Sequence, residues 1–335
     1  MRKKGRLFLS MFFIFCLCMI SACGQQGEEQ AEIRISEVTR SIFYAPLYAA
    51  IEEGFFEDEN LSIDLTTAWG GDKTMTALLS DGADIALVGA ETSVYVNAQN
   101  PADDIINFAM LTQSDGTFLI SREPNEDFEW SDLEGSSFLG QRKGGMPQMT
   151  GEFVLKNHGI DPAGDLNLIQ NVDYANIPGA FASGTGDYVQ LFEPQASQFE
   201  KEGLGHIVAS FGEESGPVPY TVFMAKDGYL QDQSDEVERF TRAIYKAQQW
   251  VYNSEAEEVA ASIAPWFEDT PQEIIASSIE RYKEQESYAK TPYLPEEAWN
   301  NLLDIMEEAG ELPERSDYNR YVDLEVADQV TGTQE

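Results

Sequence analysis

The sequence predicts an α/β protein made of two doubly wound lobes that are joined by two crossover strands. The chain of 335 residues is long enough for two domains. Segments typical of strands and helices alternate along it, which is the pattern of a mainly parallel sheet. A partial repeat supports two lobes of one plan, because Ala77–Val88 aligns with Ala180–Leu191. Two apolar, strand-like segments, Phe108–Ile120 and Pro219–Ala225, would carry the chain into the second lobe and back.

Five segments predict the first lobe. In order they are a strand at Ile33–Ser36, a helix at Pro46–Glu53, a strand at Leu61–Leu65, a helix through Leu79 and a strand at Ile85–Val88. Gly54 is a natural C-cap for the first helix, and Asp72 can cap the start of the second. The last strand is a continuous apolar run, which is typical of a strand covered on both faces.

The second lobe repeats this plan. Its predicted segments are a strand at Ser137–Leu139, a helix at Pro147–Lys156, a strand at Leu166–Val172, a helix at Ile177–Ala182 and a strand at Tyr188–Phe192. Asn157, His158 and Gly159 close the first of these helices.

The chain becomes helical from Asp235 onward. The apolar residues of the first helix fall on one face at helical spacing, with Trp250 beside it: Val237, Phe240, Ile244 and Val251. Further helices are predicted near Ala256–Phe267, Pro271–Gln285 and Pro295–Ala309. We interpret these helices as structural packing.

The N-terminus has the pattern of an export signal over residues 1–22. Basic residues precede an apolar run, Leu7–Ile20, that is short for a membrane span. Ile20-Ser21-Ala22-Cys23 then resembles the bacterial lipobox, in which the cysteine receives a lipid such as palmitate. The alternative is an uncleaved anchor helix with an incidental cysteine. Residues 23–31 are polar and would form a lipid-anchored linker.

Charge and cysteine content exclude several classes of function. The chain carries 59 acidic against 21 basic residues, a formal net charge of −38. A field of that sign repels phosphate backbones, so we expect no nucleic-acid partner. Cleavage before Cys23 would leave no other cysteine in the mature chain, which excludes internal disulfides, cysteine-ligated zinc and thiol catalysis.

Four segments resemble the substrate-binding lipoproteins of ABC importers, in the branch that groups binders of nitrate, sulfonate, taurine and thiamine pyrimidine. They are Tyr44–Phe56 (YAPLYAAIEEGFF), Ala77–Ala86 (ALLSDGADIA), Phe192-Glu193-Pro194 and Val237–Trp250 (VERFTRAIYKAQQW). The resemblance covers about Ile33 to Ala309 and implies the bilobed type II periplasmic-binding-protein fold. It implies one lobe from residues 32–113 and 221–335, a second lobe from residues 114–220, and a ligand enclosed between them. It also implies ABC permease subunits as partners, a location outside the cell membrane, and no catalytic activity.

Ligands of open α/β sheets bind beyond the carboxyl ends of the strands. This rule nominates loops at Thr39–Tyr44, Ala68–Gly71, Gly89–Ser93, Gln141–Gln148, Asp173–Asn176 and Glu193–Pro194. The candidate ligand-binding residues drawn from these loops are Tyr44, Trp69, Gly89, Glu91, Thr92, Arg142, Gly145, Met146, Tyr174 and Glu193.

Each candidate has a chemical rationale and a simpler alternative. Tyr44, Trp69 and Tyr174 can hold a flat ring between aromatic faces, or each can pack within its own lobe. Glu193 can accept two N–H donors from an amino-heterocycle, or it can be a helix-start acid that favours the helix dipole. Glu91 occupies a comparable turn. Arg142 and Lys143 are candidate anion partners, or they can lie in a solvated loop. The glycines before Met146 would let backbone amides approach a ligand.

An enzyme is the less favoured class. The two histidines, His158 and His206, have no partner histidine at metal-ligand spacing, and nucleophile-elbow, HExxH and P-loop motifs are absent. We therefore expect no metal and no cofactor. The nearest enzymatic alternative is the eukaryotic pyrimidine synthase of the same fold, which has a cysteine-rich motif that this chain lacks.

The acids near the predicted cleft favour a nitrogen heterocycle as the small-molecule ligand. Glu91, Asp173 and Glu193 border the same cleft as Arg142. An acid-lined, aromatic cleft suits a neutral or cationic heterocycle such as an aminopyrimidine precursor of thiamine. The alternative is an anion of the alkanesulfonate, taurine or nitrate type.

Overall fold

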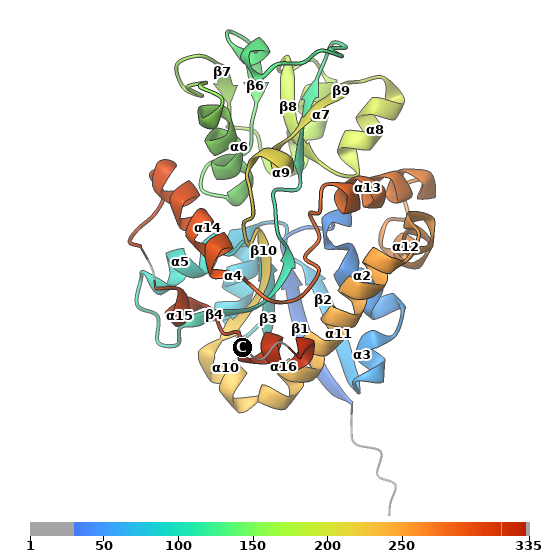
Figure 1. Ribbon diagram of the computed structural model, residues 1–335, viewed down its shortest axis with the longest axis vertical. Coiled ribbons are helices and arrows are strands. Elements are labelled where there is room, and N and C mark those ends of the chain that lie inside the picture. Colours follow the sequence, from blue (N-terminus) through green and yellow to red (C-terminus); the bar gives the residue numbers. More distant parts are fainter. Residues whose placement is uncertain (1–29, 316, 333–335) are drawn as a thin grey trace, which may run out of the picture. The chain divides into compact units, whose positions relative to one another are not determined.

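The computed structural model describes residues 30–315 and 317–332, and Glu32–Glu335 forms one compact unit. The predicted export signal, Cys23 and most of the linker lie outside the described residues. The unit contains two five-stranded sheets (Figure 1). Sheet A has the order β2-β1-β3-β10-β4, with β1 (Ala31–Glu37), β2 (Leu61–Thr67), β3 (Ile85–Val88), β4 (Ile105–Thr112) and β10 (Thr221–Lys226). Sheet B has the order β7-β6-β8-β5-β9, with β5 (Thr117–Ser121), β6 (Ser137–Leu139), β7 (Asn167–Ile169), β8 (Tyr188–Phe192) and β9 (His206–Ser210).

The two sheets share one topology. Strands β6, β7, β8 and β9 of sheet B take the places that β1, β2, β3 and β4 take in sheet A. The aspartate of the sequence repeat has the same role in both. Asp84 accepts a hydrogen bond from the backbone N–H of Arg34 at 2.9 Å, and Asp187 accepts one from Ser137 at 2.8 Å. Each aspartate thus fixes the strand that follows it, β3 or β8, to its parallel neighbour, β1 or β6.

Both sheets are mixed, although the sequence predicts a mainly parallel arrangement. β1 and β3 pair in parallel, as β6 does with β7 and β8. The exceptions are β10 in sheet A and β5 in sheet B, which run antiparallel to both of their neighbours. These two strands are the ones by which the chain enters each sheet from the other.

The predicted crossover at Phe108–Ile120 is two strands in different sheets. β4 ends at Thr112 in sheet A, β5 begins at Thr117 in sheet B, and residues 113–116 connect them. Asp115 of this connection is fully buried. The chain returns to sheet A through residues 215–220, so β10 is the second crossover strand of the prediction.

Helices surround the sheets (Figure 1). The helices of the first half are η1 (Ile42–Tyr44), α2 (Ala45–Glu52), α3 (Phe55–Asp58), α4 (Gly71–Leu79), α5 (Glu91–Asn97), η2 (Trp130–Leu133) and α6 (Met146–Asn157). Those of the middle are η3 (Tyr174–Asn176), α7 (Ile177–Ala182), α8 (Gln195–Glu202), α9 (Phe211–Glu214) and α10 (Asp227–Asp232). The C-terminal helices are α11 (Ser234–Asn253), α12 (Ala256–Ile263), η4 (Ala264–Trp266), α13 (Gln272–Glu284), α14 (Glu296–Glu308), α15 (Tyr318–Tyr321) and α16 (Glu325–Thr331).

Two local expectations differ from the structure. Asp72 was expected to cap its helix, but α4 begins at Gly71 and Asp72 lies inside the first turn. Gly70, with a φ of 148°, takes the cap position, because a side chain there would overlap the Asp72 carboxylate. The strand expected at Leu166–Val172 is only the three residues of β7, an edge strand of sheet B.

The helical face predicted after Asp235 is buried. Phe240 of α11 is fully buried and contacts the rings of Phe56, Phe108 and Phe223. Burying such a side chain stabilises the fold by about 1.5–3 kcal/mol. No helix among residues 30–315 and 317–332 is long and apolar enough to cross a membrane.

The C-terminal helices contact both sheet regions. On α13, the Tyr282 hydroxyl accepts a hydrogen bond from the Glu193 backbone N–H at 3.0 Å and donates one to the Gly116 carbonyl at 2.9 Å. Next to α14, the Lys156 ammonium of α6 donates to the Glu308 carbonyl at 3.1 Å. The Tyr282 ring also lies 5.0 Å, between centroids, from the ring of Phe43 in η1 beside sheet A, so α13 reaches both regions (Figure 1).

Candidate functional site

A buried carboxylate lies at the carboxyl end of sheet A. Glu91 is the first residue of α5 and follows β3 after a turn of two residues. It is only 5% exposed, and its Oε2 has no hydrogen-bond partner among the described residues. Burial raises the pKa of this carboxyl to about 7, although the backbone N–H groups of Glu91 and Met146 act to lower it. A buried acceptor without a donor is costly, so this oxygen is a candidate ligand contact.

The turn before Glu91 is shaped around that carboxylate. A Cβ at Gly89 would overlap both Glu91 carboxylate oxygens, so glycine leaves the space that the carboxylate occupies. The Thr92 hydroxyl donates to the Gly89 carbonyl at 2.7 Å and closes the turn. Gly89 and Thr92, both nominated from the sequence, thus hold Glu91 in place.

The start of α6, which follows β6 of sheet B, faces this carboxylate. Gly145 is the N-cap residue, and its carbonyl accepts from the backbone N–H groups of Gln148 and Met149 at 3.1 Å. Met146 is 2% exposed, and its N–H is directed at Glu91. The positive end of a twelve-residue helix from sheet B therefore meets an acid from sheet A.

Aromatic side chains from both sheets gather beside Glu91. Tyr44 is 6% exposed and electrostatically coupled to both Glu91 and Tyr174. Tyr174 is 41% exposed, and its hydroxyl faces the side chain of Thr39. Phe192 joins them, with its ring centroid 6.2 Å from that of Tyr174. The structure thus brings together four of the residues nominated from the sequence, Tyr44, Tyr174, Glu91 and Met146.

Two further residues of this cluster were not found from the sequence. Asp115 accepts from the Thr117 backbone N–H at 2.6 Å and from the hydroxyls of Thr117 and Thr150. Tyr220 is 4% exposed, and its hydroxyl lies near both Asp115 and Glu91. Both lie in the crossover segments. An aspartate inside an otherwise apolar, strand-like run was the signal that could have identified the first of them.

Trp69 is more exposed than the aromatic residues of this cluster. It is 59% exposed and makes no ring contact with any aromatic residue that the structure describes. Its φ of 57° is left-handed, a conformation that bulky residues rarely adopt. Hydrogen bonds on either side, from Ala68 N to Glu37 O at 2.9 Å and from Gly70 N to Val38 O at 3.0 Å, hold the turn.

Glu193 has a different role from the expected one. Its side chain is fully buried, and it accepts from the Ser197 backbone N–H at 2.8 Å and the Ser197 hydroxyl at 2.7 Å. The Arg281 guanidinium lies 3.1 Å from the same carboxylate. Burial raises the pKa of Glu193, and Arg281 and Ser197 oppose that shift. Because protein donors use both oxygens, the expectation that Glu193 offers them to a ligand is wrong, and Glu193 is a helix-start acid of α8.

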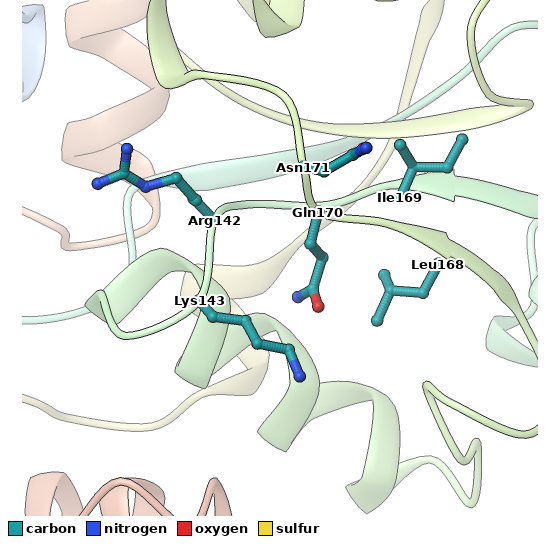
Figure 2. Close-up of a pocket in the computed structure, with 6 residues that line it drawn as sticks. All are labelled: Arg142, Lys143, Leu168, Ile169, Gln170 and Asn171. Atoms are coloured by element: carbon teal, nitrogen blue, oxygen red, sulfur yellow. The ribbon is translucent and has the colours of Figure 1, made fainter.

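Arg142 and Lys143 line an open pocket of about 530 Å³ with residues 168–171 at the end of β7 (Figure 2). The Arg142 guanidinium lies 3.6 Å from the Asp173 carboxylate, and both side chains are mostly exposed. Figure 2 shows Arg142 pointing away from Gln170 and Leu168, whereas Lys143 extends beneath them. Arg142 is therefore a solvated cation with a partner of its own.

Residues 26–265 of the chain match the NMT1-like family. The chain belongs to the NMT1-like family. A relative from Bacillus subtilis (strain 168), named "Putative binding protein YtlA", is 59% identical over 318 residues, which is 95% of each chain.

Solved structures share the fold of this NMT1-like protein. The ligand-binding component of an ABC-type import system from Staphylococcus aureus, with zinc bound, has a TM-score of 0.72 at 13% identity. That likeness covers 90% of this chain and 99% of the other. The alkanesulfonate-binding protein SsuA from Xanthomonas axonopodis pv. citri, bound to MOPS, has a TM-score of 0.70 at 17% identity and covers 89% of this chain and 100% of the other. The predicted type II periplasmic-binding-protein fold is confirmed.

The site of this NMT1-like protein offers hydrogen-bond acceptors and aromatic faces. Glu91 supplies an acceptor oxygen, and Tyr44, Tyr174 and Tyr220 supply phenol rings and hydroxyls. In the described part of the chain, no group of three or more His, Cys, Asp or Glu residues is arranged to hold a metal ion. The arrangement can accept hydrogen bonds from a flat solute and cover its faces.

Proposed function

We propose that this protein is the extracytoplasmic solute-binding protein of an ABC importer. It captures a small nitrogen heterocycle, similar to an aminopyrimidine precursor of thiamine, and delivers it to the permease without catalysing a reaction. The observation that carries the proposal is the buried Glu91 carboxylate, whose free oxygen lies beside Tyr44 and Tyr220. The family and the relative named as a binding protein support the transport role.

In this proposal, the two lobes close around the ligand when it binds. One lobe is residues 32–113 with 221–335, and the other is residues 114–220. The crossover segments, residues 113–116 and 215–220, form the hinge. The meeting of Glu91 from one lobe with the Met146 N–H from the other supports a ligand that touches both.

Export and anchoring belong to the same proposal. Residues 1–22 act as the signal peptide, and Cys23 carries the lipid that holds the protein at the outer face of the cell membrane. Residues 23–31 are then the tether. In a bacterial host, Cys23→Ala is expected to be released or to stay as unprocessed precursor, measured by fractionation and metabolic lipid labelling. A mutant that stays lipid-modified and membrane-bound like the parent would contradict the assignment.

A second candidate ligand is an alkanesulfonate-type anion. The likeness to SsuA and the two cations of the pocket in Figure 2 favour it. The acids speak against it, because Asp173 pairs with Arg142 and Glu91 has no basic partner among the described residues.

Small-angle scattering and thermal unfolding test the role. The purified mature chain is screened with aminopyrimidines and with alkanesulfonates, and any compound that raises the unfolding temperature is then tested by scattering. A ligand at 100 times its dissociation constant stabilises the protein by about 2.7 kcal/mol. We expect an aminopyrimidine to stabilise the chain and to reduce its radius of gyration. Stabilisation by alkanesulfonates alone would favour the second candidate ligand. A bound ligand that leaves the radius of gyration of an open form unchanged would refute closure.

A further inference from the structure

The free oxygen of Glu91 requires a donor that the protein does not supply. We propose that the ligand brings a positively charged N–H group, such as an amine, an amidinium or a protonated aminopyrimidine, and that Glu91 is its counter-ion. This inference rests on the proposed function and names the charge class of the solute that the same site takes.

The groups that face Glu91 carry no positive charge. Tyr44 approaches from η1, Tyr95 from α5 and Tyr220 from the segment before β10, and all three are electrostatically coupled to it. Burial and nearby acids hold the pKa of each phenol above its usual value, so these hydroxyls stay neutral. From α6 the carboxylate meets only the backbone N–H of Met146. Within the described residues, no Arg, Lys or His forms an ion pair with Glu91.

The site is shaped around a carboxylate and is not filled by apolar side chains. Gly89 leaves the space for the carboxylate, and two backbone N–H groups point at it. These donors stabilise the charged form but leave Oε2 unpaired. A buried carboxylate becomes stable when a cation pairs with it and hydrogen-bonds its remaining lone pairs.

The three charge classes of ligand should therefore bind in a definite order. A cationic N–H group supplies both the missing hydrogen bond and the opposite charge. A neutral N–H group supplies the hydrogen bond alone, and an anion such as a sulfonate offers only acceptors and is repelled. The net charge of −38 acts in the same direction at long range, because it attracts cations to the protein.

Three probes with one ring and different charges test this order. Benzamidinium is positive, benzamide is neutral and benzenesulfonate is negative, and each is titrated calorimetrically into the full mature chain at about pH 8, where Glu91 is ionised. We expect benzamidinium to bind most tightly and benzenesulfonate most weakly. Glu91→Gln should weaken benzamidinium binding by roughly ten- to hundred-fold and weaken benzamide binding much less, because the amide oxygen of glutamine still accepts a neutral hydrogen bond.

Two further variants control for charge and for folding. Asp64→Asn removes the same unit of charge from an exposed position on β2 and should not change the order. Gly89→Ala keeps every charge but displaces the Glu91 carboxylate, so it should reduce the preference for benzamidinium over benzamide. The order measured on the parent protein stands as a test even if one variant fails to fold.

The pH dependence gives an independent measurement. A proton on Glu91 competes with the cation, so benzamidinium affinity should rise as the pH increases through about 7 and then level off. The profile should be flat in Glu91→Gln. Equal binding of benzamidinium and benzamide, tighter binding of benzenesulfonate, or a preference that survives in Glu91→Gln would overturn the inference. A neutral or anionic solute that closes the lobes would overturn the inference alone, whereas absence of closure with every solute would overturn the proposed function.

Discussion

Replacing Glu193 by glutamine tests whether this acid serves the fold or the ligand. The carboxylate receives donors from Ser197 and Arg281, and it is fully buried. Glutamine keeps the shape but turns one acceptor oxygen into a donor, which then meets an N–H or O–H group. We expect the free energy of unfolding to fall and ligand affinity to stay close to the parent value.

The size of the effect follows from the contacts that are lost. A hydrogen bond to a charged group contributes about 1.5–3 kcal/mol. Removing one partner of a buried ion pair costs about 3–5 kcal/mol, but Arg281 is 28% exposed and can be rehydrated. The expected loss is therefore about 2–3 kcal/mol, which corresponds to a decrease of roughly 3–5 °C in the unfolding temperature of a unit of this length.

Urea unfolding followed by circular dichroism measures the loss, and calorimetric titration measures affinity. Glu200→Gln is the matched control, because Glu200 lies 3.4 Å from the same Arg281 but is 47% exposed. That exposed pair should contribute less than about 1 kcal/mol. An unchanged unfolding midpoint together with weaker ligand binding in Glu193→Gln would refute the structural role and show that Glu193 binds the ligand.

Three further predictions concern the neighbouring elements. Glu91→Gln should be more stable than the parent above about pH 7, by roughly 3 kcal/mol in urea unfolding, and the gain should vanish below about pH 4.5. The reason is that the raised pKa of Glu91 stabilises the folded parent at low pH, and this contribution to the free energy of unfolding is lost as the pH rises from about 4.5 to about 7. Identical dependence of stability on pH in the parent and in Glu91→Gln would contradict this prediction. Trp69→Gly should stay within about 1 kcal/mol of the parent stability, because the Trp69 ring is exposed and glycine tolerates the left-handed turn, and strong destabilisation in urea unfolding would show that the ring packs in the fold. Gly116→Ala should cost about 1–3 kcal/mol, because its Cβ would lie 2.6 Å from the Phe43 ring, whereas Gly179→Ala, with open space around it, should be neutral; equal thermal stability of the two would refute the overlap.

The sequence alone determined the plan of the fold. Apolar periodicity located most strands and helices, because burial of one face imposes a repeat of two or 3.6 residues. The repeat around Asp84 and Asp187 predicted two similar sheets. In each sheet an aspartate just before a strand accepts a hydrogen bond from a backbone N–H of the neighbouring strand. The rule that ligands lie beyond the carboxyl ends of strands nominated the loops that contain Tyr44, Glu91 and Met146.

Only the tertiary structure decided which of two glutamates, Glu91 or Glu193, has a carboxylate oxygen available to a ligand. Glu91 and Glu193 follow equivalent strands, and their local sequences do not separate a ligand contact from a helix-start acid. Glu193 meets Arg281, which comes from a helix 88 residues further along the chain, whereas no such cation reaches Glu91. Asp115 and Tyr220 likewise come together only because folding places the two crossover segments, residues 113–116 and 215–220, side by side. Burial and pairing are properties of neighbours brought together by folding, and local periodicity carries no information about them.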